Sequence, residues 1–116
     1  MSVSLITTHV LDTAKGAPAA GVPVLIEFLE SEENWREIGS GITDLDGRIK
    51  NLLQQDFKLR KGEYRITFKT EAYFSKLQVK GFYPLVQVIF RVENPESHYH
   101  VPLLLSPYGY STYRGS

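Results

Sequence analysis

The feature of this sequence that most restricts its fold is an alternation of apolar and polar residues with a period of two. A period of two is typical of strands that bury one face. Turn signals rich in Gly, Pro and Asp separate the alternating stretches, at residues 15–18, 44–47, 60–62 and 93–95. Short strands at this spacing predict an all-β sandwich or barrel. The apolar positions expected to face the core are Val24, Ile26 and Phe28; Tyr64, Ile66 and Phe68; Val86, Val88, Phe90 and Val92; and Tyr99, Val101, Leu103 and Leu105.

One segment of the chain has a helical pattern. Thr70 is a residue type that caps helices, and the acidic Glu71 follows it in what would be the first turn. We therefore expect one short helix over about residues 71–77, capped by Thr70. The length of 116 residues allows a single domain, and no internal repeat or linker interrupts residues 1–116.

The charge balance and the absence of cysteine exclude several classes of protein. Thirteen basic residues against thirteen acidic ones give a formal net charge of zero, whereas a nucleic-acid binder would carry a basic surplus. Without cysteine there is no disulfide, thiolate nucleophile or cysteine zinc site. No apolar run approaches the roughly 20 residues of a membrane helix, and residues 1–6 lack the pattern of a signal peptide. We therefore expect a cytoplasmic protein that binds neither nucleic acid nor membrane.

Two expected strands carry apolar residues on both faces. In the first, over residues 5–11, neither face is clearly polar. Near the C-terminus, the face opposite the expected core carries His98, His100, Pro102 and Leu104. A small sandwich has one core, so apolar residues on an outer face indicate a second subunit that covers it. We expect a subunit interface that includes the histidines, and we expect these outward-facing residues to meet only across that interface.

The chain has three histidines, His9, His98 and His100, each of which could serve structure or chemistry. His98 and His100 are two residues apart on an expected strand, so their side chains point to the same face. A histidine titrates near neutral pH and suits the activation of water. A His-x-His pair with a third histidine is also compatible with zinc, although no acidic ligand can be identified. Catalytic, metal-binding and structural interpretations of the histidines all stay open at this point.

Arg48 and the C-terminal tail are the remaining candidates. Arg48 follows the Asp46-Gly47 turn. Arginines at such places are commonly solvated, but a guanidinium can also grip a carbonyl or a urate-like anion through two parallel hydrogen bonds. Residues 108–116 hold three tyrosines, so we expect an ordered strand that runs close to the terminus. No Gly-x-Ser-x-Gly motif supports a serine nucleophile, so water is the expected attacking group.

Four segments resemble the 5-hydroxyisourate hydrolases of the transthyretin-like family. Residues 5–12, with the Gly-Ala-Pro-Ala that follows at 16–19, resemble the first strand of the transthyretin fold. Residues 43–48 resemble its arginine-bearing turn, and residues 98–108 resemble its late-strand signature. The terminal Tyr-Arg-Gly-Ser is similar to the tetrapeptide that ends these hydrolases. The resemblance covers essentially the whole chain.

The resemblance implies an antiparallel eight-stranded β-sandwich with one short helix, assembled as a homotetramer with active sites at the dimer–dimer interface. It implies an enzyme without cofactor or metal that opens the six-membered ring of 5-hydroxyisourate with water, in urate breakdown. It assigns catalysis to His9, Arg48, His100 and Ser116, and substrate binding to His9, Arg48, Tyr113, Arg114 and Gly115, with His98 nearby. The main alternative is a non-enzymatic transthyretin-type carrier of a small aromatic ligand, and a plain interaction module is a further one.

Overall fold

The structure, a computed structural model, describes residues 5–116. The expectation about a signal peptide therefore lies mainly outside the described residues. Within residues 5–116 the chain forms nine strands and one helix. In chain order these are β1 (Ile6–Asp12), β2 (Ala17–Pro18), β3 (Pro23–Ser31), β4 (Asn34–Ile42), β5 (Arg48–Ile49), β6 (Gly62–Phe68), α1 (Thr70–Lys76), β7 (Val86–Val92), β8 (Tyr99–Ser106) and β9 (Gly109–Thr112).

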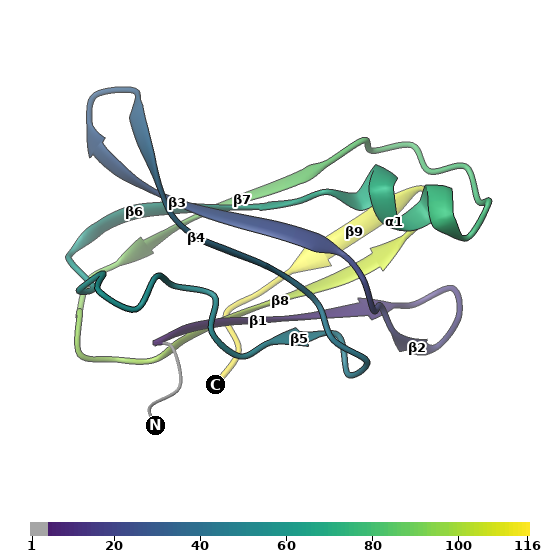
Figure 1. The fold of residues 1–116 in the computed structure, drawn as a ribbon, viewed down its shortest axis with the longest axis horizontal. Coiled ribbons are helices and arrows are strands. Elements are labelled where there is room, and N and C mark those ends of the chain that lie inside the picture. Colours follow the sequence, from purple (N-terminus) through teal and green to yellow (C-terminus); the bar gives the residue numbers. More distant parts are fainter. Residues whose placement is uncertain (1–4) are drawn as a thin grey trace.

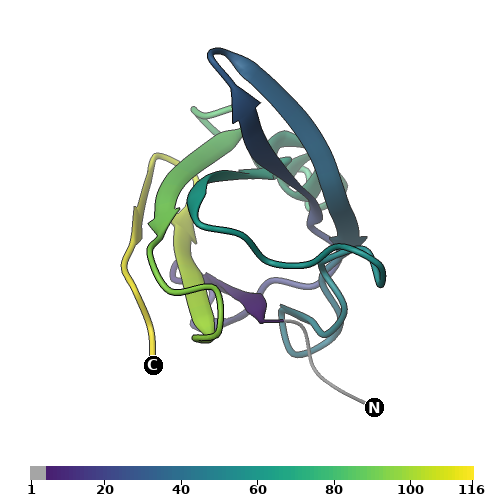
Figure 2. The same cartoon turned by 90° about the vertical axis from the view of Figure 1, so that its left-hand side faces the viewer.

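The strands form two sheets that lie face to face. One sheet has the order β4-β3-β6-β7, with every pair antiparallel. The other has the order β2-β1-β8-β9, and β5 also pairs with β1. Figure 1 and Figure 2 show the two layers, between which the apolar core is packed. The expected all-β sandwich with one short helix is confirmed.

The second sheet differs in two details from the expected set of eight antiparallel strands. β1 and β8 run parallel, with Ile6 opposite Tyr99 and Asp12 opposite Leu105. A tight turn forces two strands to be antiparallel, but most of the chain separates β1 from β8, so their relative direction is not set locally. β2 and β5, each of two residues, both pair with β1 and raise the number of strands in the described part of the chain to nine.

The predicted core faces are buried, with one exception at a sheet edge. The positions of β3, β6 and β8 that were predicted to face the core are each at most 5% exposed. In β7, Val86 and Val92 are buried, whereas Val88 and Phe90 are only partly buried and pack against the core from its side. β7 is the outermost strand of its sheet, which explains the weaker burial at the middle of the strand. Alternation therefore identified the correct face of every one of these strands.

The helix lies where it was expected, but the prediction that Thr70 caps it is wrong. α1 begins at Thr70 itself, Lys69 occupies the capping position, and no side chain caps the end. The Thr70 hydroxyl instead donates to the carbonyl oxygen of Tyr83 at 2.7 Å. The N–H of Glu71 donates to the carbonyl oxygen of Pro84 at 3.1 Å. The loop at residues 83–84 therefore satisfies the start of the helix, and the threonine is used to hold that loop.

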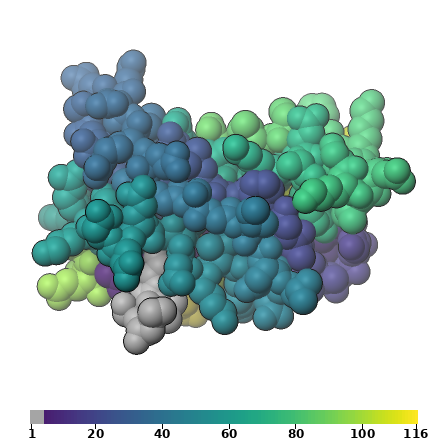
Figure 3. Space-filling model, viewed as in Figure 1, coloured from purple at the N-terminus to yellow at the C-terminus, as the bar shows by residue number. Residues whose placement is uncertain are grey.

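The long segment between β5 and β6 closes one side of the sandwich. Leu52 is fully buried, and Leu53, Phe57 and Leu59 pack against the core. Figure 3 shows this segment, in teal, spread over the lower part of the visible face. Within residues 5–116 no helix has the length and apolar character needed to cross a membrane.

A buried carboxylate ties the helix to the end of β1. Asp12 is 2% exposed, and its two oxygens accept hydrogen bonds from the Tyr73 hydroxyl at 2.8 Å and from the Lys15 backbone N–H at 3.1 Å. Burial, together with the hydrogen bond and charge of Asp12, raises the pKa of Tyr73 well above its ordinary value. Tyr73 therefore keeps its proton and remains a donor to Asp12.

Replacing Tyr73 with Phe removes this donor and leaves the ring in place. We expect the free energy of unfolding to fall by about 1–3 kcal/mol, because a buried acceptor loses a partner. Urea unfolding followed by the fluorescence of Trp35, the single tryptophan, measures the loss. Tyr108→Phe is the matched control, since that side chain is 68% exposed. Equal effects of the two substitutions would contradict a stabilising role for the Asp12 contact.

Candidate active site

Strands β1, β5 and β8 bring the candidate residues onto one outer face of a single chain. In the β1–β8 register Thr7 lies opposite His100, and in the β1–β5 register His9 lies opposite Arg48. Directly paired residues project to the same face of a sheet, so imidazoles and guanidinium share one surface. The expectation that these residues meet only across a subunit interface is therefore wrong. They meet within one chain because β8 and β5 flank β1, a pairing that the period of two does not encode.

A tight turn holds Arg48 at this face. One carboxylate oxygen of Asp44 accepts the backbone N–H of Asp46 at 2.9 Å and that of Arg48 at 3.0 Å. The hydrogen bond from the Arg48 N–H is the main cause that holds the pKa of Asp44 below its ordinary value, so the carboxylate stays ionised. Gly47 has a φ of +76°, and a Cβ there would collide with the carbonyl oxygen of Val10. The Asp-Gly sequence is thus needed both for the turn and for its close approach to β1.

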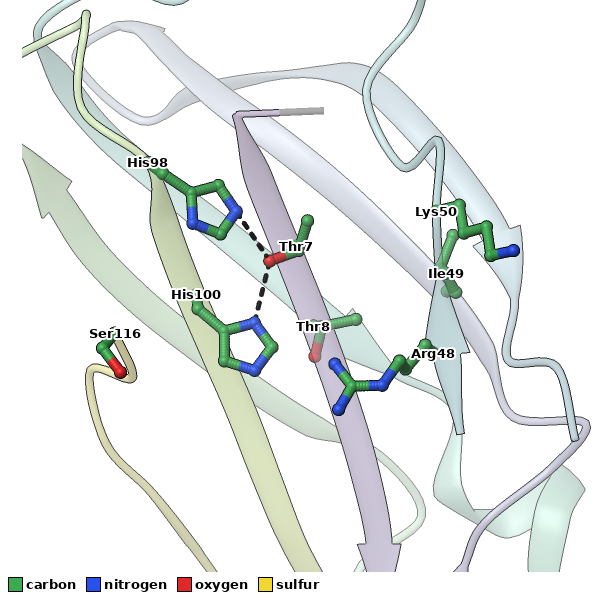
Figure 4. Close-up of a pocket in the computed structure, with 8 residues that line it drawn as sticks. All are labelled: Thr7, Thr8, Arg48, Ile49, Lys50, His98, His100 and Ser116. Carbon is green, nitrogen blue, oxygen red and sulfur yellow. Dashed lines mark hydrogen bonds between the residues drawn. The ribbon is translucent and has the colours of Figure 1, made fainter. Parts of the chain in front are cut away.

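The face contains a half-open pocket of about 280 Å³. Figure 4 shows the imidazoles of His98 and His100 side by side, with the Arg48 side chain reaching across β1 towards His100. Ser116 stands on the opposite side of β8 from Arg48. Among the described residues the pocket is lined by Thr7, Thr8, Arg48, Ile49, Lys50, His98, His100 and Ser116.

Thr7 joins the two histidines of the pocket. Its hydroxyl oxygen lies 2.8 Å from Nδ1 of His100 and 3.0 Å from Nε2 of His98. The two rings are nearly parallel, with centroids 6.4 Å apart and an interplanar angle of 15°. The second nitrogen of His100, Nε2, lies on the edge of the ring away from Thr7 (Figure 4).

Burial lowers the pKa of His100 from its ordinary value near 6.5, and the electrostatic influence of the neighbouring Arg48, His98 and His9 lowers it further. A hydrogen bond with Thr7 acts in the opposite direction but is the smallest of these effects. The imidazole of His100 is therefore neutral at neutral pH. A neutral imidazole with one nitrogen free can accept a proton from water.

The C-terminal tail is ordered against His100. The Gly115 N–H donates to the carbonyl oxygen of His100 at 2.8 Å, and the two residues form an isolated β-bridge. A Cβ on Gly115 would lie 2.6 Å from Cδ2 of the His100 ring, so only glycine fits this contact without moving the ring. The hydrogen bond and the close contact place Ser116 at the pocket. The expectation of an ordered strand near the terminus is met by β9 and this bridge.

The remaining predicted residues do not line the pocket in the single chain. The His9 ring lies over Gly47, at a distance of 3.3 Å from a Cβ placed there. The guanidinium of Arg114 is stacked on the ring of Tyr99, 4.5 Å from its centroid. Tyr113 is 58% exposed. The pocket thus brings together three predicted site residues, Arg48, His100 and Ser116, and the predicted neighbour His98.

Sequence reasoning missed four pocket residues, Thr7, Thr8, Ile49 and Lys50. Thr7 carried a usable signal, because it is two residues before His9 on an expected strand and so shares its face. Lys50 stands two residues after Arg48, but a lysine beside a turn has no distinguishing pattern. Within residues 5–116 no group of three or more His, Cys, Asp or Glu side chains is placed to hold a metal ion. The three-histidine zinc alternative therefore has no geometric support.

The arrangement has the parts needed for a hydrolysis that uses water as the nucleophile. His100 offers a neutral ring nitrogen, and Arg48 offers donors that can bind a carbonyl oxygen or an oxyanion. A serine nucleophile would need a base beside its hydroxyl, and no hydrogen bond joins Ser116 to a histidine in the described part of the chain. Water as the attacking group therefore stays a prediction.

Comparison with known proteins gives a consistent assignment. Residues 6–115 match the model of the HIUase/Transthyretin family. A probable 5-hydroxyisourate hydrolase of Caenorhabditis elegans is 46% identical over 111 residues, which are 96% of this chain and 81% of that protein. The structure of the Klebsiella pneumoniae 5-hydroxyisourate hydrolase matches with a TM-score of 0.82 and 33% identity, over 100% of both chains.

Sea bream transthyretin in complex with thyroxine has a similar structure as well. Its TM-score is 0.88 at 32% identity, covering 97% of this chain and 95% of that one. The fold is therefore shared by hydrolases and by a hormone-binding protein, and fold alone does not separate the two activities. Since the family model spans nearly the whole sequence, this chain belongs to the HIUase/Transthyretin family.

Proposed function

We propose that this chain is a 5-hydroxyisourate hydrolase, which opens the six-membered ring of 5-hydroxyisourate with water. The product is 2-oxo-4-hydroxy-4-carboxy-5-ureidoimidazoline, an intermediate of urate degradation. The observation that carries the proposal is the pocket in which a neutral His100 and the Arg48 guanidinium face each other. The 46% identity to a protein named as a probable hydrolase of this substrate supports it.

The polar groups on this face make a non-enzymatic carrier of an aromatic ligand the weaker alternative. A channel that holds an apolar aromatic ligand requires shape and apolar lining, with few polar groups. Here two imidazoles, a guanidinium and the chain terminus line one pocket. Such groups lose hydrogen bonds to water when a ligand covers them, and only a polar substrate can replace those hydrogen bonds.

The proposed reaction uses His100 as the base and Arg48 as the electrophilic group. Water gives a proton to Nε2 of His100 while its oxygen bonds to the ring carbonyl carbon. The carbonyl oxygen becomes an oxyanion, which the guanidinium of Arg48 stabilises; such donors contribute typically about 3 kcal/mol each. The oxyanion then collapses, the ring C–N bond breaks, and the proton passes from His100 to the departing nitrogen.

The other predicted site residues are proposed to orient substrate and water. His9 lies opposite Arg48 in the sheet and would position water or polarise the substrate. Ser116 would bind a substrate edge at the side of the pocket away from Arg48. Tyr113 is exposed and Arg114 rests on Tyr99 in the single chain, so their proposed contacts with substrate would require the tail of the assembled protein.

We propose that the assembled protein is a homotetramer with its active sites at the dimer–dimer interface. The outer face of β1 is half-buried already in one chain, and its Leu11 lies opposite Leu104 of β8. These leucines lie on the same outer face as Thr7 and His100 of the pocket. A second copy placed over this face would therefore cover apolar surface and close the site at the same time. A cytoplasmic location and a single domain over residues 1–116 stay predictions.

The direct test generates 5-hydroxyisourate with urate oxidase and follows its ultraviolet decay. The wild-type protein should accelerate the decay far beyond the spontaneous rate. His100→Asn and His9→Asn should each lower kcat by roughly 10²–10⁴-fold, the usual contribution of general acid–base catalysis. Thermal unfolding should stay close to wild type, because both side chains lie on the outer face of the sheet. Near wild-type rates in both variants would exclude the assignment of the two histidines.

The lowered pKa of His100 predicts the acid limb of the pH profile. If neutral His100 is the base, kcat/KM rises as pH rises through the pKa of this group and is level above it. Because burial and Arg48 lower that pKa, the midpoint should lie below 6.5. Arg48→Gln removes one of the lowering charges, so its residual activity should show a midpoint shifted upward. A midpoint above 6.5 in the wild-type protein, or an unchanged midpoint in Arg48→Gln, would contradict this explanation.

The tail is testable by truncation and by one substitution. Removing residues 114–116 should abolish activity while leaving the oligomer assembled, as measured by light scattering. Gly115→Ala should lower activity as well, because its Cβ would displace the His100 ring. Gly109→Ala is the matched control, since a Cβ there meets only the Ser106 hydroxyl at 3.7 Å. A fully active truncated protein would remove the tail from the site.

A further inference from the structure

We propose that Thr7 is a positioning residue that holds His100 in the Nδ1-protonated tautomer and so leaves Nε2 free as the base. The proposal rests on the function proposed above and adds a residue to its machinery. It starts from one hydroxyl oxygen within hydrogen-bond distance of two ring nitrogens, Nδ1 of His100 at 2.8 Å and Nε2 of His98 at 3.0 Å.

The single hydroxyl proton of Thr7 limits how it can bond the two histidine rings. A threonine hydroxyl has one proton to donate and two lone pairs with which to accept. It can therefore donate to only one of the two ring nitrogens, and at least one ring must present an N–H to it. The tautomers of His98 and His100 are thus coupled through the oxygen of Thr7.

The charge of Arg48 decides which ring donates. Nε2 lies on the edge of the His100 ring away from Thr7, and the guanidinium of Arg48, which carries only donors, reaches across β1 towards that ring (Figure 4). A proton on Nε2 would add a donor near the positive charge of Arg48, which already lowers the pKa of this ring. The proton of neutral His100 is therefore placed on Nδ1, where Thr7 accepts it. The Thr7 hydroxyl is then free to donate to Nε2 of His98.

The hydrogen bonds of Thr7 stay in place during the proposed proton transfer. When Nε2 of His100 accepts the proton of water, its Nδ1–H bond to Thr7 stays as it was. The hydrogen bond from Thr7 to His98 also stays unchanged, so proton uptake requires no rearrangement of the network. Groups that are already oriented for the charged state lower the barrier without a cost of reorganisation. In the opposite tautomer Nε2 would carry a proton and could not act as a base.

A matched pair of substitutions separates the hydroxyl from the shape of the side chain. Thr7→Val keeps the shape and removes the hydroxyl, whereas Thr7→Ser keeps the hydroxyl. Thr13→Val is the control, because this substitution also replaces a threonine hydroxyl with a methyl group. The hydroxyl of Thr13, the residue after β1, donates to the carbonyl oxygen of Leu105. We expect kcat to fall roughly 10- to 100-fold in Thr7→Val, with a smaller change in KM. Thr7→Ser should retain most of the activity, and Thr13→Val all of it.

Long-range ¹H–¹⁵N spectra of the histidine rings at pH 8 give the direct readout. The wild-type protein and Thr7→Ser should show His100 protonated at Nδ1, and Thr7→Val should show a mixture of tautomers or the Nε2 form. Wild-type His100 protonated at Nε2 would overturn the proposal, and this measurement needs no variant to fold. Wild-type kcat in Thr7→Val, or an equal loss in Thr7→Ser, would overturn it as well.

The two hypotheses fail separately. The tautomer is measured without substrate, so it decides the role of Thr7 towards His100 whatever the enzyme acts on. If the wild-type protein leaves the decay of 5-hydroxyisourate unchanged, the proposed function alone is excluded.

Discussion

The parallel pairing of β1 with β8 is the constraint on which the rest of the structure depends. It joins the beginning of the chain to its end through seven consecutive residue pairs, from Ile6 and Tyr99 to Asp12 and Leu105. Backbone bonds extend it beyond both ends, from Tyr99 N–H to Leu5 and from Thr13 N–H to Leu105. Inside the core, the Thr8 hydroxyl donates to the carbonyl oxygen of Val101 at 2.6 Å. Contacts this distant in sequence are costly in chain entropy, so the buried apolar surface of both strands must offset that cost.

The same register builds the core and the candidate site at once. One face of the pair buries Ile6, Val10 and Leu103, and the other face presents Thr7 and His100 as direct partners. A slip by one residue would turn every side chain of a strand to the other face and would bury a histidine in the core. Stability therefore enforces the register that brings the threonine to the imidazole. No further interaction is needed to keep the strands of the site aligned.

The sequence predicted which residues face inward far better than which strands become neighbours. Alternation identified the buried face of β3, β6 and β8, because burial of one face repeats with the pleat. It contained nothing about the parallel partner of β1, nor about β2 and β5, since two residues are too short to show a period. The Thr70 cap was wrong for a related reason. A hydroxyl bonds whichever group the fold brings to it, and here that group is the carbonyl of Tyr83, thirteen residues further along the chain.

The candidate site was also predicted only in part, because the sequence shows residue types but not which strands become neighbours. Residue type made the histidines and Arg48 candidates, and the family resemblance assigned His9, Arg48 and His100 to the site. Thr7 was passed over because a threonine in a strand has no chemical signature of its own. Its importance comes from a register that sets it against His100 and from a geometry that lets it reach His98 as well. Arg48 acts through the same arrangement, since a guanidinium near the His100 ring disfavours an added proton on that ring. Two groups that are ordinary in sequence, one on each side of an imidazole, thus determine where its proton lies, and this determines whether the ring can act as a base.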